Sequence, residues 1–176
     1  MVLNDVWIKA NSWMFNPYDE TKVNPASIDL CWSGRYKTTV GYWKDESVKT
    51  WEKSDGLWTP MYEQDLLTIC PGELYLLDTL ETLQIPPDVC GMLMLKSSMG
   101  RYGLEHLHAG YFDPGFGYEN PSTGTLEIHN VSPRCITIRK GQPIVQMMFL
   151  QMNAVPERDY RHTGRYNGQK SPQEAK

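Results

Sequence analysis

Residues 91–130 read GMLMLKSSMGRYGLEHLHAGYFDPGFGYENPSTGTLEIHN, and this stretch decides the fold. It begins with a short apolar run, Gly91 to Leu95, and ends with Thr125 to Asn130, where Leu126 and Ile128 alternate with polar residues. A period of two is typical of a strand with one buried face. The glycine and proline residues between the two runs are typical of turns. The stretch therefore predicts strands joined by turns.

The same pattern extends to both sides of this stretch. Between residues 34 and 60, Gly34, Gly41 and Gly56 predict short strands, or a hairpin and a loop. A short helix is expected within residues 1–12. Many short strands between turns predict a mainly β fold, either a sandwich or a barrel. The further extended segments expected are Leu74–Leu83, Cys135–Arg139 and Val145–Met152.

The composition indicates one globular domain. The chain has 176 residues, of which 40% are hydrophobic and 22% charged, and its formal net charge is -4. An acidic balance argues against a nucleic-acid-binding protein, which usually carries a basic excess. We find no apolar run long enough to span a membrane, and the first residues do not resemble a signal peptide. We therefore expect a cytoplasmic protein with no membrane or nucleic-acid partner.

The cysteines stand apart from one another in the sequence, without a CxxC pair. In a reducing compartment, such residues usually serve as small apolar side chains. We therefore expect this role for all of them, namely Cys31, Cys70, Cys90 and Cys135.

Several familiar catalytic signatures are missing from the sequence. Zinc-dependent nucleotide deaminases use a His-x-Glu or Cys-x-Glu segment and a distant Pro-Cys-x-x-Cys, and neither occurs. His106 and His108 are two residues apart, but no further ligand is spaced to complete a zinc site. The Gly-x-Ser-x-Gly elbow and the GxxxxGK[ST] phosphate loop are absent as well. We therefore expect no zinc and no nucleophilic serine of that type.

The segment from Lys96 to Arg101 has the residue types that hold a phosphate. Small residues after a strand let backbone N–H groups approach phosphate oxygens, and the hydroxyls of Ser97 and Ser98 add donors. Lys96 and Arg101 bring positive charge, and an arginine can bind two oxygens at once. The alternative is structural: Ser97 or Ser98 caps a helical turn that runs to Leu104.

Two carboxylates follow this segment. Asp113 lies between Gly110 and Gly115, where it is either a turn residue bonded to its own backbone or a ligand. Glu127 stands in the middle of an alternating strand. If Glu127 faces solvent, it is an ordinary outward residue. If it faces a pocket, its pKa rises and it can move a proton.

Together these segments resemble the active-site region of the dCTP deaminase family, which shares its fold with the dUTPases. The resemblance rests on the order and near-spacing of Lys96–Leu104, Ala109–Phe116 and Thr125–Ile128. It continues in Val23–Leu30, before the first core strand, and in the carboxyl-terminal Arg165–Gln169. It is weak between residues 35 and 68.

The resemblance implies a distorted β-barrel or jelly roll of the dUTPase-like type. Residues 1–159 would form the barrel, and residues 160–176 a tail that closes over the active site. The family assembles as a homotrimer with active sites between subunits. Glu127 would be the proton shuttle, which activates a water to attack C4 of the cytosine of dCTP and passes the proton to the departing ammonia. Ser97 and Arg101 would complete the catalytic site.

The resemblance also implies the nucleotide-binding residues. Asp113 would bond the 3′-hydroxyl of the deoxyribose, Phe116 would pack on the sugar, and the backbone around Ala109 would help to fix the water. The triphosphate would carry Mg²⁺, and no metal would be needed to make the nucleophile. The remaining nucleotide-binding residues would be Lys96, Ser98, Tyr160, Arg165, Tyr166 and Gln169.

The sequence departs from the family pattern in three places. Lys96 replaces the usual arginine, and His108 stands where a threonine is usual. Residues 118–122 lengthen a hairpin near the site. These departures leave open which base the protein selects and whether another nucleotide regulates it by feedback.

A dCTP deaminase that gives dUTP and ammonia is our first interpretation of the function. The segment Ala109–Asp113 also resembles the bifunctional members, which hydrolyse the triphosphate as well and give dUMP and pyrophosphate. A plain dUTPase would use Asp113 as its base, but it lacks a glutamate at the position of Glu127. A non-catalytic, nucleotide-sensing member is the last alternative. The intact set of Ser97, Arg101, Asp113 and Glu127 argues against it.

Overall fold

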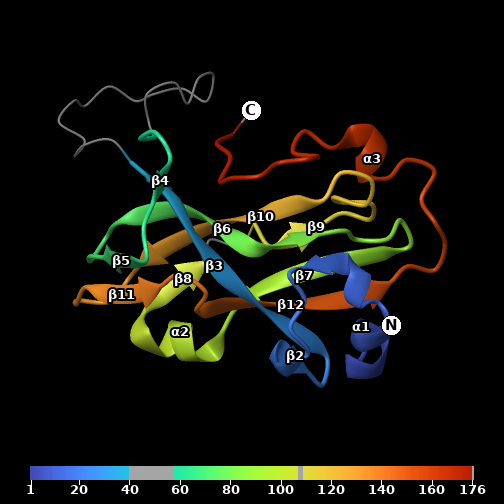
Figure 1. Ribbon diagram of the computed structural model, residues 1–176, viewed down its shortest axis with the longest axis horizontal. Coiled ribbons are helices and arrows are strands. Elements are labelled where there is room, and N and C mark those ends of the chain that lie inside the picture. The colour runs from blue at the N-terminus through green and yellow to red at the C-terminus, as the bar shows by residue number, and fades with distance from the viewer. Residues whose placement is uncertain (40–57, 107–108, 176) are drawn as a thin grey trace.

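The computed structural model describes residues 1–39, 58–106 and 109–175 of the chain (Figure 1). Gly41 and Gly56, which we expected to break the chain into short elements, lie outside the described residues, as does His108.

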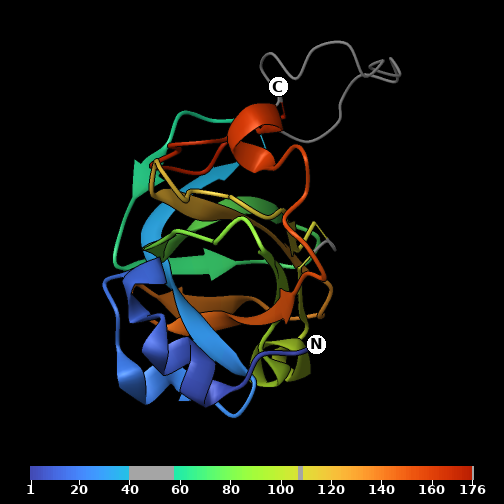
Figure 2. The same cartoon turned by 90° about the vertical axis from the view of Figure 1, so that its right-hand side faces the viewer.

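Most of the described strands belong to one antiparallel sheet with the order β8-β10-β6-β3-β12-β7-β9. The first half of β3 pairs with β12 and its second half with β6, so β3 crosses between two layers of a curled sheet (Figures 1 and 2). The strands of this path are β3 (Ser27–Thr38), β6 (Leu74–Leu83), β7 (Val89–Leu95), β8 (Leu104–His106), β9 (Tyr111–Phe112), β10 (Ser122–Asn130) and β12 (Pro143–Gln151).

Shorter elements complete the architecture. Strands β1 (Phe15–Asn16), β2 (Val23–Asn24) and β4 (Tyr62–Glu63) pair with β6 or β3, and β5 (Leu66–Ile69) pairs with β11 (Ile136–Arg139) in a second, two-stranded sheet. The helices are α1 (Asp5–Ala10), α2 (Ser97–Tyr102) and α3 (Tyr160–Thr163), with 3-10 turns η1 (Ser12–Met14) and η2 (Glu20–Lys22). The predicted mainly β fold with a short amino-terminal helix is confirmed. None of the helices in the described part of the chain has the length and apolar character to cross a membrane.

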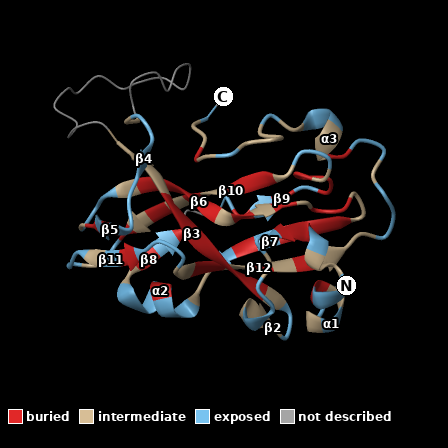
Figure 3. Cartoon of the chain, in the orientation of Figure 1, coloured by how far each residue is buried: buried red, intermediate tan, exposed pale blue. Residues whose placement is uncertain are grey.

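The core fills the space between the two layers (Figure 3). Trp32, Leu77, Leu126 and Phe149, one from each of β3, β6, β10 and β12, are fully buried. Burial of a side chain such as leucine or phenylalanine contributes roughly 1.5–3 kcal/mol. In β10 the burial alternates from residue 125 onward, as the sequence predicted. This alternation leaves Glu127 on the face away from the core.

Strand β3 corrects one expectation. Gly34 was expected to end a short strand, but β3, which is 12 residues long, continues through it. The register with β6 shifts between Trp32 and Tyr36, and Gly34 has a φ of 98°, which a residue with a side chain rarely adopts. A Cβ at Gly34 would also lie 2.8 Å from Cδ of Lys140. Glycine therefore bends this strand instead of ending it.

The cysteines correct a second expectation. Cys70 and Cys135 are joined by a disulfide across 65 residues of sequence, whereas Cys31 and Cys90 are buried free thiols, as expected. The pairing of β5 with β11 places Ile69 opposite Ile136 and so brings the adjacent cysteines together. A disulfide between distant segments depends on this long-range register, which leaves no local signal in the sequence.

Candidate functional site

Glu127 lies in the middle of β10, and 27% of its side chain is exposed. Burial raises the pKa of this carboxyl, because removal from water disfavours the charged form. Nε2 of His106, at the end of β8, lies 3.4 Å from Oε2 of Glu127. The two outcomes foreseen for Glu127 were an ordinary outward residue and a pocket-facing carboxyl with a raised pKa, and the raised pKa agrees with the second.

His106 is a neighbour of Glu127 that the sequence analysis missed. Its side chain is buried, and its backbone pairs with Ile128. We had considered His106 only as a zinc ligand. Nothing in the sequence indicates that β8 pairs with β10. The proximity of His106 to Glu127 could therefore be seen only from the register of these two strands. Within the described ranges, no three His, Cys, Asp or Glu side chains gather as a metal site would require.

Asp113 lies at the surface of a turn whose next residues are buried. Phe116 is 5% exposed, and its ring lies edge-on to Phe112 with the centroids 4.9 Å apart. Tyr160 of α3 packs on the other side, with its ring centroid 5.3 Å from that of Phe116. The backbone N–H of Tyr160 donates to the carbonyl of Pro114 at 2.8 Å. Helix α3 therefore holds the loop that carries Asp113.

Gly110, just before this loop, has a packing role. A Cβ at Gly110 would collide with the backbone carbonyl of Leu93 on β7, and the Leu93 N–H donates to the Gly110 carbonyl at 2.7 Å. The glycine therefore permits a close approach of two backbones. Ala109, next to it, is exposed.

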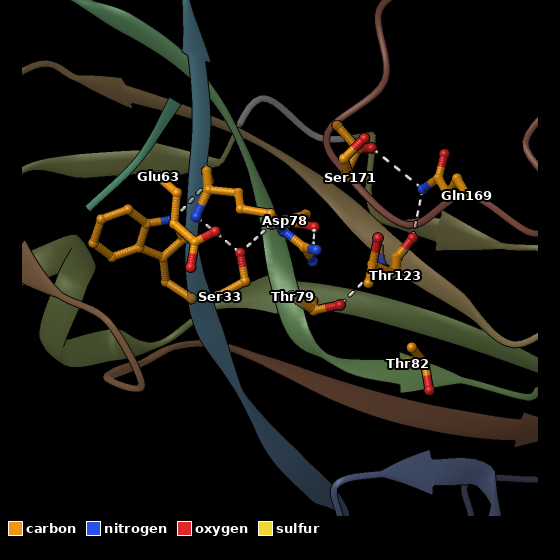
Figure 4. Close-up of polar contacts among 12 residues, drawn as sticks. Ser33, Glu63, Asp78, Thr79, Thr82, Thr123, Gln169 and Ser171 are labelled. Carbon is orange, nitrogen blue, oxygen red and sulfur yellow. Dashed lines mark hydrogen bonds and ion pairs between the residues drawn. The ribbon is translucent and has the colours of Figure 1, made fainter. Parts of the chain in front are cut away.

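The chain after α3 lies along β10 (Figures 1 and 4). The N–H of Thr123 donates to the carbonyl of Gln169 at 3.0 Å, and the side-chain amide of Gln169 donates back to the carbonyl of Thr123 at 2.5 Å. The N–H of Gln173 donates to the hydroxyl of Thr125 at 3.2 Å. Thr125 lies two residues before Glu127, so the tail crosses the same face of β10 that carries this carboxylate.

An aromatic residue of the tail contacts α3. The N–H of Tyr166 donates to the hydroxyl of Tyr160 in α3 at 3.3 Å, and Arg165, which precedes Tyr166, is exposed. Further along, Nζ of Lys37 on β3 lies 2.6 Å from a carboxylate oxygen of Glu174. The tail is thus anchored both at α3 and at β3.

A buried ion pair lies under this face, and the sequence gave no indication of it. Asp78 on β6 is paired in register with Thr125, and Nη2 of Arg35 lies 2.5 Å from its Oδ2 (Figure 4). Ser33 donates to the same carboxylate. Burial raises the pKa of Asp78 to about 6, against the lowering effects of Ser33 and Arg35. This network joins β6 to β3, and β6 is the neighbour of β10 in the same sheet.

The segment with the serines forms α2 and presents them to solvent. Ser97, Ser98 and Arg101 are exposed. The helix begins after Lys96 and no side chain caps its amino end, so the structural alternative of a serine cap is wrong. Lys96 makes an ion pair with Asp29. The other end of the helix is closed by Gly103 in the left-handed conformation.

The structure therefore brings only some of the expected site residues together. Asp113 and Phe116 belong to the loop that α3 holds, and Glu127 lies two residues along β10 from Thr125, which the tail contacts. The α2 residues belong elsewhere, because α2 and α3 lie at opposite ends of the molecule in both views (Figures 1 and 2). A single chain thus carries two separate groups of candidate site residues.

Comparisons with known proteins agree on one family. A family model described as dCTP deaminase-like matches residues 5–152. The dCTP deaminase, dUMP-forming, of Methanopyrus kandleri is 34% identical over 165 residues, which are 90% of this chain and 82% of the relative. The dCTP deaminase, dUMP-forming, of Rhodococcus erythropolis is 32% identical over 186 residues, which are 100% of this chain and 96% of the relative.

A solved structure shows the same fold. The 2′-deoxycytidine 5′-triphosphate deaminase from Agrobacterium tumefaciens superposes with a TM-score of 0.64 at 20% sequence identity. The superposition covers 84% of this chain and 47% of that chain. The predicted dUTPase-like class of the fold is thereby confirmed.

Proposed function

The chain belongs to the dCTP deaminase-like family, and we propose that it hydrolyses dCTP to dUMP, ammonia and pyrophosphate. Our first interpretation of the sequence stopped at dUTP. The names of the two relatives favour the dUMP-forming alternative instead. The structural observation that carries the proposal is the half-buried Glu127, whose pKa is raised, on the face of β10 that the tail crosses.

Glu127 would act as both base and acid in the deamination. Its carboxylate takes a proton from a water, whose oxygen attacks C4 of the cytosine. The protonated carboxyl then gives the proton to the amino group, which leaves as ammonia, and transfer of the other water proton from the oxygen on C4 to N3 gives dUTP. A carboxyl with a raised pKa suits this second step, because it holds a proton closer to neutral pH than an exposed glutamate does.

Asp113 would serve the second hydrolysis. After deamination, its carboxylate would take a proton from another water, whose oxygen attacks the α-phosphorus and displaces pyrophosphate. Asp113 would also accept a hydrogen bond from the 3′-hydroxyl of the sugar, with Phe116 against the sugar face and the backbone at Ala109 near the attacking water. Gly110, by contrast, has a packing role through its contact with Leu93.

The triphosphate, bound as its Mg²⁺ complex, would lie between copies of the chain. Lys96, Ser97, Ser98 and Arg101 lie on or beside α2, at the opposite end of the molecule from α3. We therefore propose that α2 of one copy completes the site of another in a homotrimer. Residues 160–176 would close over the phosphates and exclude water. The closing residues would be Tyr160, Arg165, Tyr166 and Gln169.

Product analysis tests the proposed function directly. Purified protein is incubated with dCTP, dUTP or dCMP in the presence of Mg²⁺, and the products are separated by chromatography, with ammonia and pyrophosphate measured in parallel. We expect dCTP to give dUMP, ammonia and pyrophosphate. Accumulation of dUTP without pyrophosphate would mean that the protein is a plain deaminase. Turnover of dUTP alone would mean that it is a dUTPase. As a further check, Asp113→Asn should suppress pyrophosphate release.

A further inference from the structure

The disulfide between Cys70 and Cys135 lies where a small reductant can reach it. Cys70 directly follows β5 and is half-buried, and Cys135 directly precedes β11 and is exposed. The free thiols of Cys31 and Cys90 are buried. Because thiol–disulfide exchange requires access to a sulfur, the bonded pair is the redox-reactive one among the cysteines.

The two segments joined by the disulfide are also joined by Asn130. This fully buried residue ends β10, the strand that carries Glu127. Its side-chain nitrogen donates to the carbonyl of Ile69 at 2.8 Å and to the carbonyl of Arg134 at 2.7 Å. Ile69 and Arg134 are the residues in front of the two cysteines. The amide satisfies both carbonyls only while the segments keep their spacing, and the disulfide fixes that spacing.

The same segment supports α2. The N–H of Val131 donates to the carbonyl of Gly103, which ends α2, at 2.9 Å. A Cβ at Gly103 would collide with the side chain of Ser132, so the two backbones are in close contact. The N–H of Ser132 in turn donates to Oδ1 of Asn130 at 2.9 Å. A continuous set of contacts therefore leads from the disulfide through residues 130–134 to the end of α2.

We propose that the Cys70–Cys135 disulfide is a reversible redox clamp on α2. While it is intact, it holds residues 130–134 and α2 in place. Its reduction loosens this segment and weakens the binding of the triphosphate, a consequence that rests on the proposed function of Ser97 and Arg101. In the reduction, a thiolate of a dithiol attacks one sulfur of the bond and forms a mixed disulfide. The second thiol of the reductant then displaces the remaining cysteine, so the protein gains two thiols and the reductant becomes a disulfide.

The first test follows α2 directly and does not depend on catalysis. The protein is equilibrated in mixtures of reduced and oxidised dithiothreitol, its thiols are counted by alkylation and mass spectrometry, and hydrogen exchange is measured for the amides of residues 97–103. We expect exchange to accelerate about tenfold when the disulfide opens, and to slow again on reoxidation. Unchanged exchange at α2 in the fully reduced protein would overturn the proposal. So would loss of the whole fold on reduction, which would make the bond a structural link only.

The second test measures substrate affinity at a temperature where circular dichroism shows both forms folded. We expect the KM for dCTP to rise about fivefold on reduction, as weakened charge-assisted hydrogen bonds would give, with a smaller change in kcat. The double variant Cys70→Ser/Cys135→Ser should show the raised KM in every mixture, and Cys90→Ser should respond as the parent does. A lower unfolding temperature with an unchanged KM would contradict the clamp. An oxidised parent that does not turn over dCTP would instead contradict the proposed function and leave the exchange experiment to decide on the clamp.

Discussion

Helix α2 and the β10 face differ in how they present their polar groups. On α2, the side chains of Ser97 and Arg101 extend into solvent. On β10, Glu127 is half-buried, and the hydroxyl of Thr125 already accepts a hydrogen bond from the tail. Exposed hydroxyls and a cation suit a charged, hydrated group such as a triphosphate, whereas a partly desolvated carboxyl suits proton transfer to a base. This difference is what the proposed division of one active site into two complementary half-sites requires.

The largest effect is expected on the β10 half-site. Glu127→Gln keeps the shape of the side chain but cannot take a proton from water, so deamination should fall by at least about 10²-fold. Binding of dCTP, measured by calorimetry, should survive. Glu105→Gln, which removes an exposed carboxylate from the neighbouring strand β8, is the matched control and should keep its activity. Near-normal turnover by Glu127→Gln would mean that Glu127 is an ordinary outward strand residue with no role in catalysis.

The α2 half-site should respond differently. Arg101→Ala removes a charge-assisted contact with the phosphates, so kcat/KM for dCTP should fall about 10- to 100-fold, mainly through KM. Arg139→Ala removes an exposed arginine from β11 and serves as the control. Equal behaviour of the two arginine variants would show that α2 does not bind the substrate.

A smaller effect is expected from the tail that covers the β10 half-site. Deletion of residues 164–176 removes the contacts with Thr123 and Thr125 but leaves Tyr160 packed on Phe116. We expect kcat/KM to fall about tenfold and the unfolding temperature to change little, because few apolar side chains are lost. Thr125→Val should move kcat/KM in the same direction by less. An unchanged KM after the deletion would make the tail a passive extension.

The smallest effect concerns the pH dependence of deamination. Burial raises the pKa of Glu127 above the ordinary 4.5, and the carboxylate must be ionised to accept a proton. Activity should therefore be lost as the pH falls through a value above 4.5. The acid limb of kcat/KM for dCTP measures this value, and Glu105→Gln should leave it in place. A limb at or below 4.5 would mean that Glu127 is not desolvated in the active enzyme.

The fold could be predicted largely from local patterns. The alternation in β10 and the turn signals around β6, β7 and β12 indicated strands, because burial on one face dictates a period of two. What could not be predicted depends on long-range register. The passage of β3 through Gly34 and the meeting of Cys70 with Cys135 both arise from pairings between distant segments, which leave no mark in the neighbouring sequence.

The candidate site was predictable only as a set of residues. The resemblance to the family singled out Glu127, Asp113 and Arg101, and their roles remain predictions. The sequence could not reveal His106 beside Glu127 or the ion pair of Asp78 with Arg35, because both depend on which strands are neighbours in the sheet. Nor could it show that α2 lies at the opposite end of the molecule from α3, which holds the loop of Asp113.

A complementation experiment tests the two half-sites most directly. Glu127→Gln and Arg101→Ala are co-expressed with different affinity tags, and assemblies that contain both are purified and assayed with dCTP. If each site takes Glu127 from one copy and Arg101 from the next copy of a trimer, about a third of the sites in every mixed trimer carry both native residues. In assays at dCTP concentrations well below KM, where each variant alone turns over dCTP much more slowly than the native protein, the account predicts recovery toward about a third of the native activity. Mixed assemblies that stay as inactive as either variant alone would contradict it.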